Sequence, residues 1–94
     1  MKKHNAIVQW TDPKAGGRKT VPTDLYSTPA QFEGHEGEWW SVRLQLYQPM
    51  DAKFRIYYAD VWFLSPDAPH DWLKPGARFR LHEGDRVVGI GECT

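Results

Sequence analysis

The chain has 94 residues, which is too short for two separate hydrophobic cores, so we expect residues 1–94 to form a single domain. Twelve basic side chains balance twelve acidic ones, which excludes a general field that attracts polyanions. No apolar run approaches the roughly 20 residues of a membrane span, and the N-terminus has no signal-peptide core. The single cysteine, Cys93, cannot form an internal disulfide, so we expect a soluble cytoplasmic protein.

The N-terminal third predicts strands separated by polar loops. A short strand over Ala6–Trp10 ends at Asp12-Pro13, and a basic, glycine-containing loop follows over Lys14–Lys19. Thr20–Phe32 contains two prolines, which fit edge or bulged strand segments because proline has no backbone donor. Glu33–Glu38 predicts a polar loop.

The middle of the chain predicts two long strands. The residues of Trp40–Leu46 alternate between apolar and polar, which is typical of a strand with one buried face. A turn is expected at Gln48–Asp51. Lys53–Leu64 is the longest strand candidate, and an acidic residue on its apolar face predicts a bulge near Ala59–Val61.

The C-terminal third predicts a loop and a hairpin. Three prolines within Ser65–Gly76 exclude a helix or a central strand there. Arg78–His82 alternates like a strand, and Gly84-Asp85 has the glycine of a type II′ hairpin turn.

The last strand is expected to place Val88 and Ile90 on one face and two glycines, Gly89 and Gly91, on the other. Glycines in a strand allow a sharp bend or the close approach of another backbone. About six strands at this spacing indicate an all-β barrel. The side chains that we expect in its core are Val42, Leu44, Leu46, Phe54, Ile56, Phe79 and Leu81.

Two separated motifs occur in the order found in a known family. The first reads Gly16-Gly17-Arg18-Lys19-Thr20-Val21-Pro22, followed by Tyr26, Pro29, Gln31 and Phe32. The second reads Arg78-Phe79, Leu81, Glu83-Gly84, Val88-Gly89 and Gly91. Together they resemble the third, C-terminal domain of translation elongation factor Tu, and the resemblance extends over roughly Ala6–Thr94.

The resemblance implies a closed six-stranded antiparallel β-barrel that stands alone. The middle of the chain is shorter than the family pattern, with only Pro49-Met50-Asp51 where the family has a P-G-D-N turn. The chain has no G-x-x-x-x-G-K-(S/T) phosphate loop, so GTP binding and hydrolysis are excluded.

No residue pattern predicts catalysis. None of the four histidines has the spacing of a metal ligand pair, and His35, among three glutamates, is best interpreted as part of a solvated acidic loop. His70-Asp71 lacks a nucleophile motif. We therefore expect no enzyme, no metal and no cofactor.

The resemblance also implies a binding surface at one end of the barrel. Family residues that hold the T-stem of aminoacyl-tRNA match Arg18, Gln31, Glu83 and Gly84, and Lys19 replaces a histidine there. Such a surface would recognise the RNA backbone through the two cations, with few acids competing for them.

A protein partner linked to translation is the function that we favour. Trp39, Tyr47, Tyr57 and Phe63 are expected opposite the core, where exposed aromatics anchor interfaces, and we select Trp39 and Tyr57 as contacts. A decoy or immunity-type role fits such a module. RNA-backbone recognition is the alternative, and a homodimer or a paralogue without a partner stays open.

Overall fold

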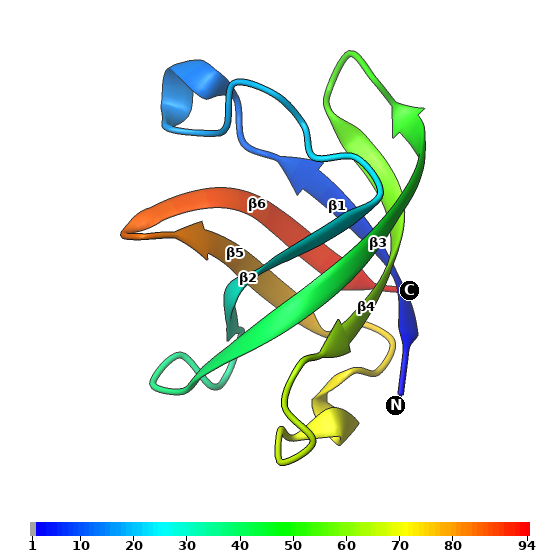
Figure 1. Ribbon diagram of the computed structural model, residues 1–94, viewed down its shortest axis with the longest axis vertical. Coiled ribbons are helices and arrows are strands. Elements are labelled where there is room, and N and C mark those ends of the chain that lie inside the picture. The colour runs from blue at the N-terminus through cyan, green and yellow to red at the C-terminus, as the bar shows by residue number, and fades with distance from the viewer. Residues whose placement is uncertain (1) are drawn as a thin grey trace.

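The computed structural model describes residues 2–94, which form one closed antiparallel β-barrel (Figure 1). The strands pair in the order β1-β4-β3-β2-β5-β6, and β6 closes onto β1. Two single-turn 3₁₀ helices, η1 (Pro13–Ala15) and η2 (His70–Trp72), lie in loops. The predicted six-stranded all-β barrel is therefore confirmed. Its strands are β1 (His4–Trp10), β2 (Leu25–Phe32), β3 (Trp39–Asp51), β4 (Ile56–Phe63), β5 (Arg78–Glu83) and β6 (Arg86–Cys93).

The barrel interior is filled by alternate side chains from every strand. Its largest fully buried residues are Trp10, Phe63 and Phe79, and the loop between β4 and β5 closes one end with Leu73, which is fully buried. Packed interiors of this kind are expected for a barrel of so few strands. Five of the predicted core residues are buried as expected: Val42, Leu44, Leu46, Phe79 and Leu81.

Strand β4 is one residue out of the predicted register. Phe54 lies in the turn before it and is 56 % exposed, and Ile56 is only half-buried and faces outward. The inward residues are instead Tyr57, half-buried, and the buried Phe63, with Ala59 and Val61 between them. The expectation that Tyr57 and Phe63 are exposed is therefore wrong, because apolar residues on both faces of β4 make its period ambiguous.

The bulge predicted in β4 lies in its partner strand. β4 pairs with β1 without interruption through Ala59–Val61, whereas its pairing with β3 shifts between Leu46 and Asp51. The segment predicted as a turn, Gln48–Asp51, is therefore the irregular end of β3, and the chain reverses at residues 52–55. A bulge there bends the strand, as closure of a small barrel requires.

The glycines of β6 face the core. Val88 is buried and Ile90 is 53 % exposed, so the two do not share a face. In the pairing of β5 with β6 the register shifts after Leu81, so Val88 has no partner on β5. As a result, Gly89 faces inward together with Gly91. A Cβ at Gly91 would lie 2.2 Å from the Phe79 ring, so the absence of a side chain makes room for this ring. The neighbour that approaches Gly91 closely is thus an aromatic side chain, whereas the sequence led us to expect another backbone.

The β5–β6 hairpin and the proline of β2 match their predictions. Gly84 has a φ of +64°, and Asp85 lies outside the left-handed region, as in a type II′ turn. β2 pairs with β5 only over Ala30–Phe32, so Pro29 lies just where that pairing ends. Beyond it, the Thr28 hydroxyl donates to the carbonyl of His82, which keeps the two strands together.

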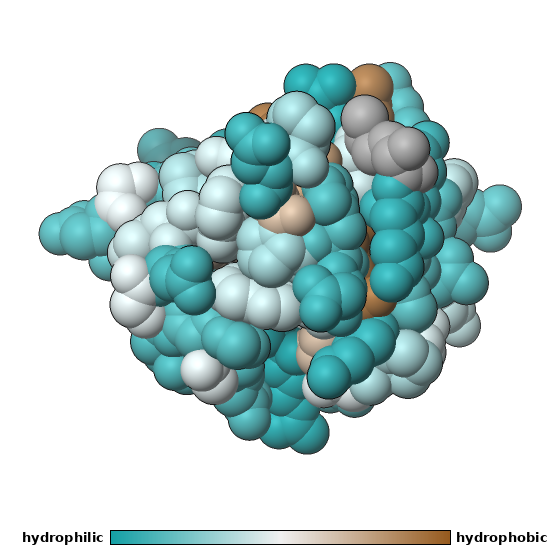
Figure 2. All heavy atoms as spheres, turned by 90° about the horizontal axis from the view of Figure 1, so that it is seen from below, coloured by the Kyte–Doolittle hydropathy of each residue, from teal (hydrophilic) through white to brown (hydrophobic). Residues whose placement is uncertain are grey.

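The end of the barrel that carries the 33–38 and 64–77 loops is mainly hydrophilic. Figure 2 views this end, where hydrophobic residues show only in small areas between polar ones. Three glutamates of the 33–38 loop are exposed there, and His35 stacks on Trp72 with ring centroids 3.8 Å apart. An apolar contact surface must therefore be sought on the sides of the barrel.

Candidate functional site

The basic loop and the last hairpin meet, as the resemblance implied. Arg18 Nη1 lies 2.5 Å from Glu83 Oε2, and the Tyr26 hydroxyl donates to the same oxygen over 2.5 Å. Arg86 Nη2 lies 3.7 Å from Glu83 Oε1. We call these four residues the Arg18–Glu83 cluster.

The basic loop is fixed by further contacts. Arg55 donates to the carbonyls of Thr11 (3.0 Å) and Arg18 (2.8 Å), and Arg86 donates to that of Gly16 (3.3 Å). A Cβ at Gly17 would lie 1.9 Å from the Thr11 carbonyl oxygen, so only glycine fits there. Gly17 therefore serves the packing of this loop, and Gly16, with a φ of +94°, serves its left-handed turn.

The charged side chains of the Arg18–Glu83 cluster are paired with one another, since Glu83 faces both Arg18 and Arg86. Burial raises the pKa of Glu83, but hydrogen bonds from Tyr26 and Arg18 outweigh it, and the net pKa is lowered. Burial first, and the bond to Glu83 second, raise the pKa of Tyr26 to about 12. The expectation that Arg18 has few competing acids is therefore wrong, since Glu83 itself binds it.

Gln31 does not join this end of the barrel. It pairs with Arg80 on β5, and Glu83 lies three residues further along, about 10 Å away at the usual strand rise. The Gln31 side chain instead donates to the carbonyl of Glu36 over 2.9 Å. The predicted meeting of Gln31 with the Glu83-Gly84 turn is therefore wrong.

Trp39 lies next to Gln31 and is exposed, as expected. It pairs with Gln31 across β2 and β3, is 51 % exposed, and sets its ring edge against His82 at a centroid distance of 4.7 Å. Among the other predicted contacts, Lys19 and Gly84 are exposed. Tyr57 packs against the core and presents little surface.

The sides of β1, β4 and β6 carry an apolar surface that the sequence did not predict. The chain contains three isoleucines, and all three face outward: Ile7 and Ile56 are half-buried, and Ile90 is 53 % exposed. Gln9 pairs with Ile56 on one side and Ile90 on the other, and Ile7 pairs with Tyr58. We call Ile7, Gln9, Ile56, Tyr58 and Ile90 the isoleucine face.

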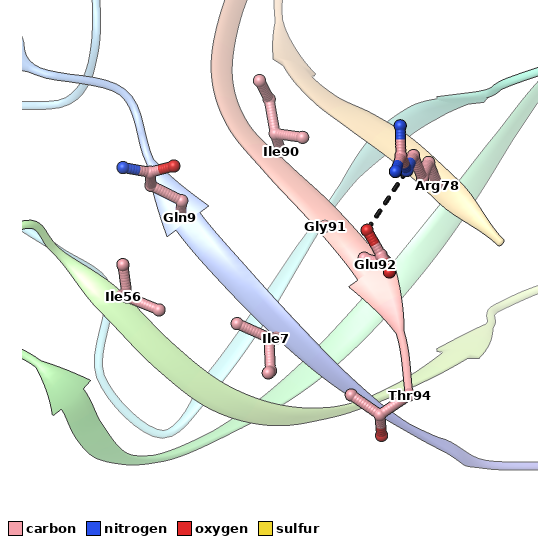
Figure 3. Close-up of a pocket in the computed structure, with 8 residues that line it drawn as sticks. All are labelled: Ile7, Gln9, Ile56, Arg78, Ile90, Gly91, Glu92 and Thr94. Atoms are coloured by element: carbon pink, nitrogen blue, oxygen red, sulfur yellow. Dashed lines mark hydrogen bonds and ion pairs between the residues drawn. The ribbon is translucent and has the colours of Figure 1, made fainter. Parts of the chain in front are cut away.

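A shallow groove runs through the isoleucine face. Its volume is about 390 Å³, and Figure 3 shows Ile7 and Ile56 on one side and Ile90 on the other, with Arg78 and Glu92 beyond. Arg78 Nε donates to Glu92 Oε1 over 3.1 Å, so this pair of charges is neutralised at the rim. The groove therefore offers apolar contact without an unpaired charge at its centre.

The groove continues toward the predicted contacts Gln31 and Trp39. Arg80 pairs with Ile90 on one side and Gln31 on the other, and Gln31 pairs with Trp39. A second hollow of about 210 Å³ lies between Ile90 and Gln31, and it is lined by Gln31, Glu33, Arg78, Phe79, Arg80 and Ile90. These two predicted residues therefore belong with the isoleucine face, on the side of the barrel.

The signal for this face was present in β1. Ala6, Val8 and Trp10 alternate with Ile7 and Gln9, and the first set is the buried one. Once Ala6, Val8 and Trp10 are known to be buried, alternation requires Ile7 to face outward. From the sequence alone, an apolar residue such as Ile7 is ordinarily assigned to the core.

The structure shows no arrangement for metal chemistry or for a helical membrane span. Within residues 2–94, no three histidine, cysteine or acidic side chains are grouped to hold a metal ion. Nor does any helix in this part of the chain have the length and apolar character to cross a membrane. No protein-family model and no curated protein matches the chain. The resemblance to elongation factor Tu rests on its two motifs and remains a prediction.

Proposed function

We propose that the chain is a non-catalytic protein-binding module whose main contact surface is the isoleucine face. The observation that carries the proposal is the placement of all three isoleucines on the outside of three neighbouring strands, with Gln9 between Ile56 and Ile90. Isoleucine is among the residues most often buried, and clustered exposed apolar side chains mark interaction sites. A partner that covers them recovers the free energy of their exposure to water.

The expected size of this contribution is measurable. Removing apolar area from water contributes about 25 cal/mol per Å², so covering the exposed half of one isoleucine contributes roughly 1–2 kcal/mol. Trp39 adds a half-exposed aromatic ring beside the second hollow. Rings of this kind are frequent anchors of protein interfaces.

The partner that we propose belongs to the translation machinery. This part of the proposal follows from the two motifs that resemble the third domain of elongation factor Tu. A free-standing copy of such a barrel could occupy a protein that normally contacts the elongation factor, either as a decoy or as an immunity protein against a toxin.

The geometry gives less support to RNA-backbone recognition. Phosphate binding needs several free cations, but Arg18 is 2.5 Å from Glu83 and Arg86 also faces that carboxylate. Lys19 remains exposed at this end, beside a hollow of about 500 Å³. The RNA alternative is therefore tested as an outcome of the same experiment.

The test is affinity capture from lysate of the source cells, scored separately for protein and for RNA. We compare the wild type with Ile90→Ser and with a matched control, Leu25→Ser. Leu25 is 51 % exposed on β2, three strands from β1 in either direction around the barrel.

The proposal predicts that a protein is captured and that its capture persists after nuclease treatment. This protein should bind the Leu25→Ser variant as well as the wild type and bind Ile90→Ser about tenfold more weakly. Capture of RNA that depends on Lys19 would favour the RNA alternative. Equal binding by the wild type and Ile90→Ser would exclude the isoleucine face as the contact surface.

A further inference from the structure

The shape of the barrel restricts what can cover the isoleucine face. The molecule measures 34 × 27 × 21 Å, and the outside of a closed barrel is convex. Two convex surfaces touch only along a narrow strip, whereas an extended segment can follow a groove. The groove beside Ile7 and Ile90 and the hollow beside Arg80 adjoin, since Arg78 and Ile90 line both. They form one track across β1, β6 and β5.

Charge along the track is uneven. The Arg78–Glu92 pair is closed at 3.1 Å, but Arg80 is exposed and makes no ion pair within residues 2–94. Glu33 lines the same hollow and Glu36 lies on the neighbouring loop, yet neither is within ion-pair distance of Arg80 among the described residues. An incoming carboxylate therefore finds a cation with free donors directly across from Ile90. The exposed acid Glu33 instead lies across from Arg78, whose side chain is already paired with Glu92.

We propose that the occupant is an extended segment of the partner protein that places an aliphatic side chain in the isoleucine groove and a carboxylate on Arg80. This inference rests on the proposed function and names the partner's chemistry. β1 and β5 lie two strand spacings apart, about 10 Å, which matches two or three residues of extended chain. The expected recognition pattern is therefore leucine or isoleucine with aspartate or glutamate two or three positions away.

The test uses two pools of fluorescein-labelled eight-residue peptides and the purified chain. The acidic pool has leucine or isoleucine with glutamate or aspartate two or three positions away, and the basic pool has lysine or arginine in the charged position. Fluorescence anisotropy gives the affinity of each pool for the wild type, Arg80→Glu, Ile90→Ser and a control charge reversal, Lys14→Glu. Lys14 is exposed within η1 and lines neither the groove nor the second hollow.

We expect the wild type to bind the acidic pool about tenfold more tightly than the basic pool. The difference combines attraction of Arg80 for the carboxylate with its repulsion of the lysine or arginine. Arg80→Glu should reverse this preference, and Lys14→Glu should keep it. Ile90→Ser should weaken both pools, because it removes the apolar contact.

Each contrary result has a distinct meaning. If both pools bind equally and Ile90→Ser weakens both, the groove binds apolar segments but the carboxylate is not recognised, so this inference is overturned while the proposed function stands. If neither pool binds, an extended segment is not the occupant, and the inference is overturned again. The proposed function is then decided by the capture experiment, in which a folded partner can still depend on Ile90.

Discussion

At the scale of single residues, Glu83 decides what the basic end of the barrel can do. It accepts hydrogen bonds from Arg18 and Tyr26 on one oxygen and faces Arg86 with the other. Each of the two sequence motifs contributes a residue to this contact. Arg18 and Glu83 therefore have a structural role, since their contact holds the basic loop against the β5–β6 hairpin.

We predict that Glu83→Gln destabilises the protein by about 1–3 kcal/mol, since it leaves Arg18 without its charge-assisted bond. Denaturant unfolding measures the loss. The matched control is Glu92→Gln, because the Arg78–Glu92 pair is largely exposed and should contribute less than about 1 kcal/mol. Equal losses in the two variants would contradict this role of Glu83.

The same contact predicts that the free energy of unfolding falls in acid. The folded-state pKa of Glu83 is lowered, so its contribution is present above the unfolded pKa and is lost as the pH falls through the folded one. The wild type should therefore lose more stability than Glu83→Gln when the pH is lowered below about 4.5. Parallel pH profiles of the two proteins would show that the carboxylate is not stabilised by folding.

His82 predicts a second pH effect, nearer neutrality. Its ring is buried under Trp39, and burial first and Arg80 second lower its pKa. The unfolded chain therefore binds the proton more readily, and stability should fall as the pH drops below about 6.5. His82→Gln should remove this part of the decline. The other histidines remain in both proteins, so the difference between the two curves isolates His82, and no difference would contradict the prediction.

At the scale of elements, β6 shows how a core residue of one strand shapes its neighbour. Gly91 lies where a Cβ would overlap the Phe79 ring at 2.2 Å, whereas a Cβ at Gly37 would meet nothing within 4 Å. We predict that Gly91→Ala destabilises the barrel by about 1–3 kcal/mol or more, as overpacking does, and that Gly37→Ala is nearly neutral. Thermal unfolding of the pair measures the contrast, and equal midpoints would mean that Phe79 moves aside without loss.

The centre of β3 gives the corresponding test for an underpacked core. Leu44 is fully buried between β2 and β4, so Leu44→Ala should cost about 2–5 kcal/mol through the cavity that it leaves. Denaturant unfolding is again the measurement. A loss as small as that of an exposed control such as Leu25→Ala would place Leu44 on the wrong face.

Sequence patterns predicted the strands in which only one face is apolar. The alternation in β3 and β5 was sufficient to place Leu44 and Leu81 in the core, because the opposite positions are polar. In β4, aromatic or aliphatic residues occupy both faces, so periodicity alone could not choose the register. In β6, the inward positions are glycines, whose place is determined by a ring on β5 that is distant in sequence.

The candidate site was predictable only in part for a related reason. Arg18 and Glu83 came together as the two motifs implied, but the isoleucine face is visible only after β1, β4 and β6 are placed side by side. Each of its isoleucines, taken alone, looks like an ordinary core residue. Their shared exposure is a property of the assembled sheet.

At the scale of the whole molecule, the closed barrel presents two distinct surfaces. One end holds a basic loop that is fixed by its own contacts, and one side holds an apolar track that ends at Arg80, Gln31 and Trp39. In the function that we propose, the apolar track provides affinity and the charge at its rim selects among partners. We propose that this track, not the basic end, is the contact surface.

Isoleucine-methyl NMR tests that claim most directly, because all three isoleucines of the chain lie on the face in question. Spectra of chain labelled only at isoleucine methyls are recorded in buffer and in clarified lysate of the source cells. We predict that the three signals broaden or shift in lysate, and that excess unlabelled wild type restores them whereas excess unlabelled Ile90→Ser does not. Three signals as sharp in lysate as in buffer, from a sample that still captures its partner, would contradict the account.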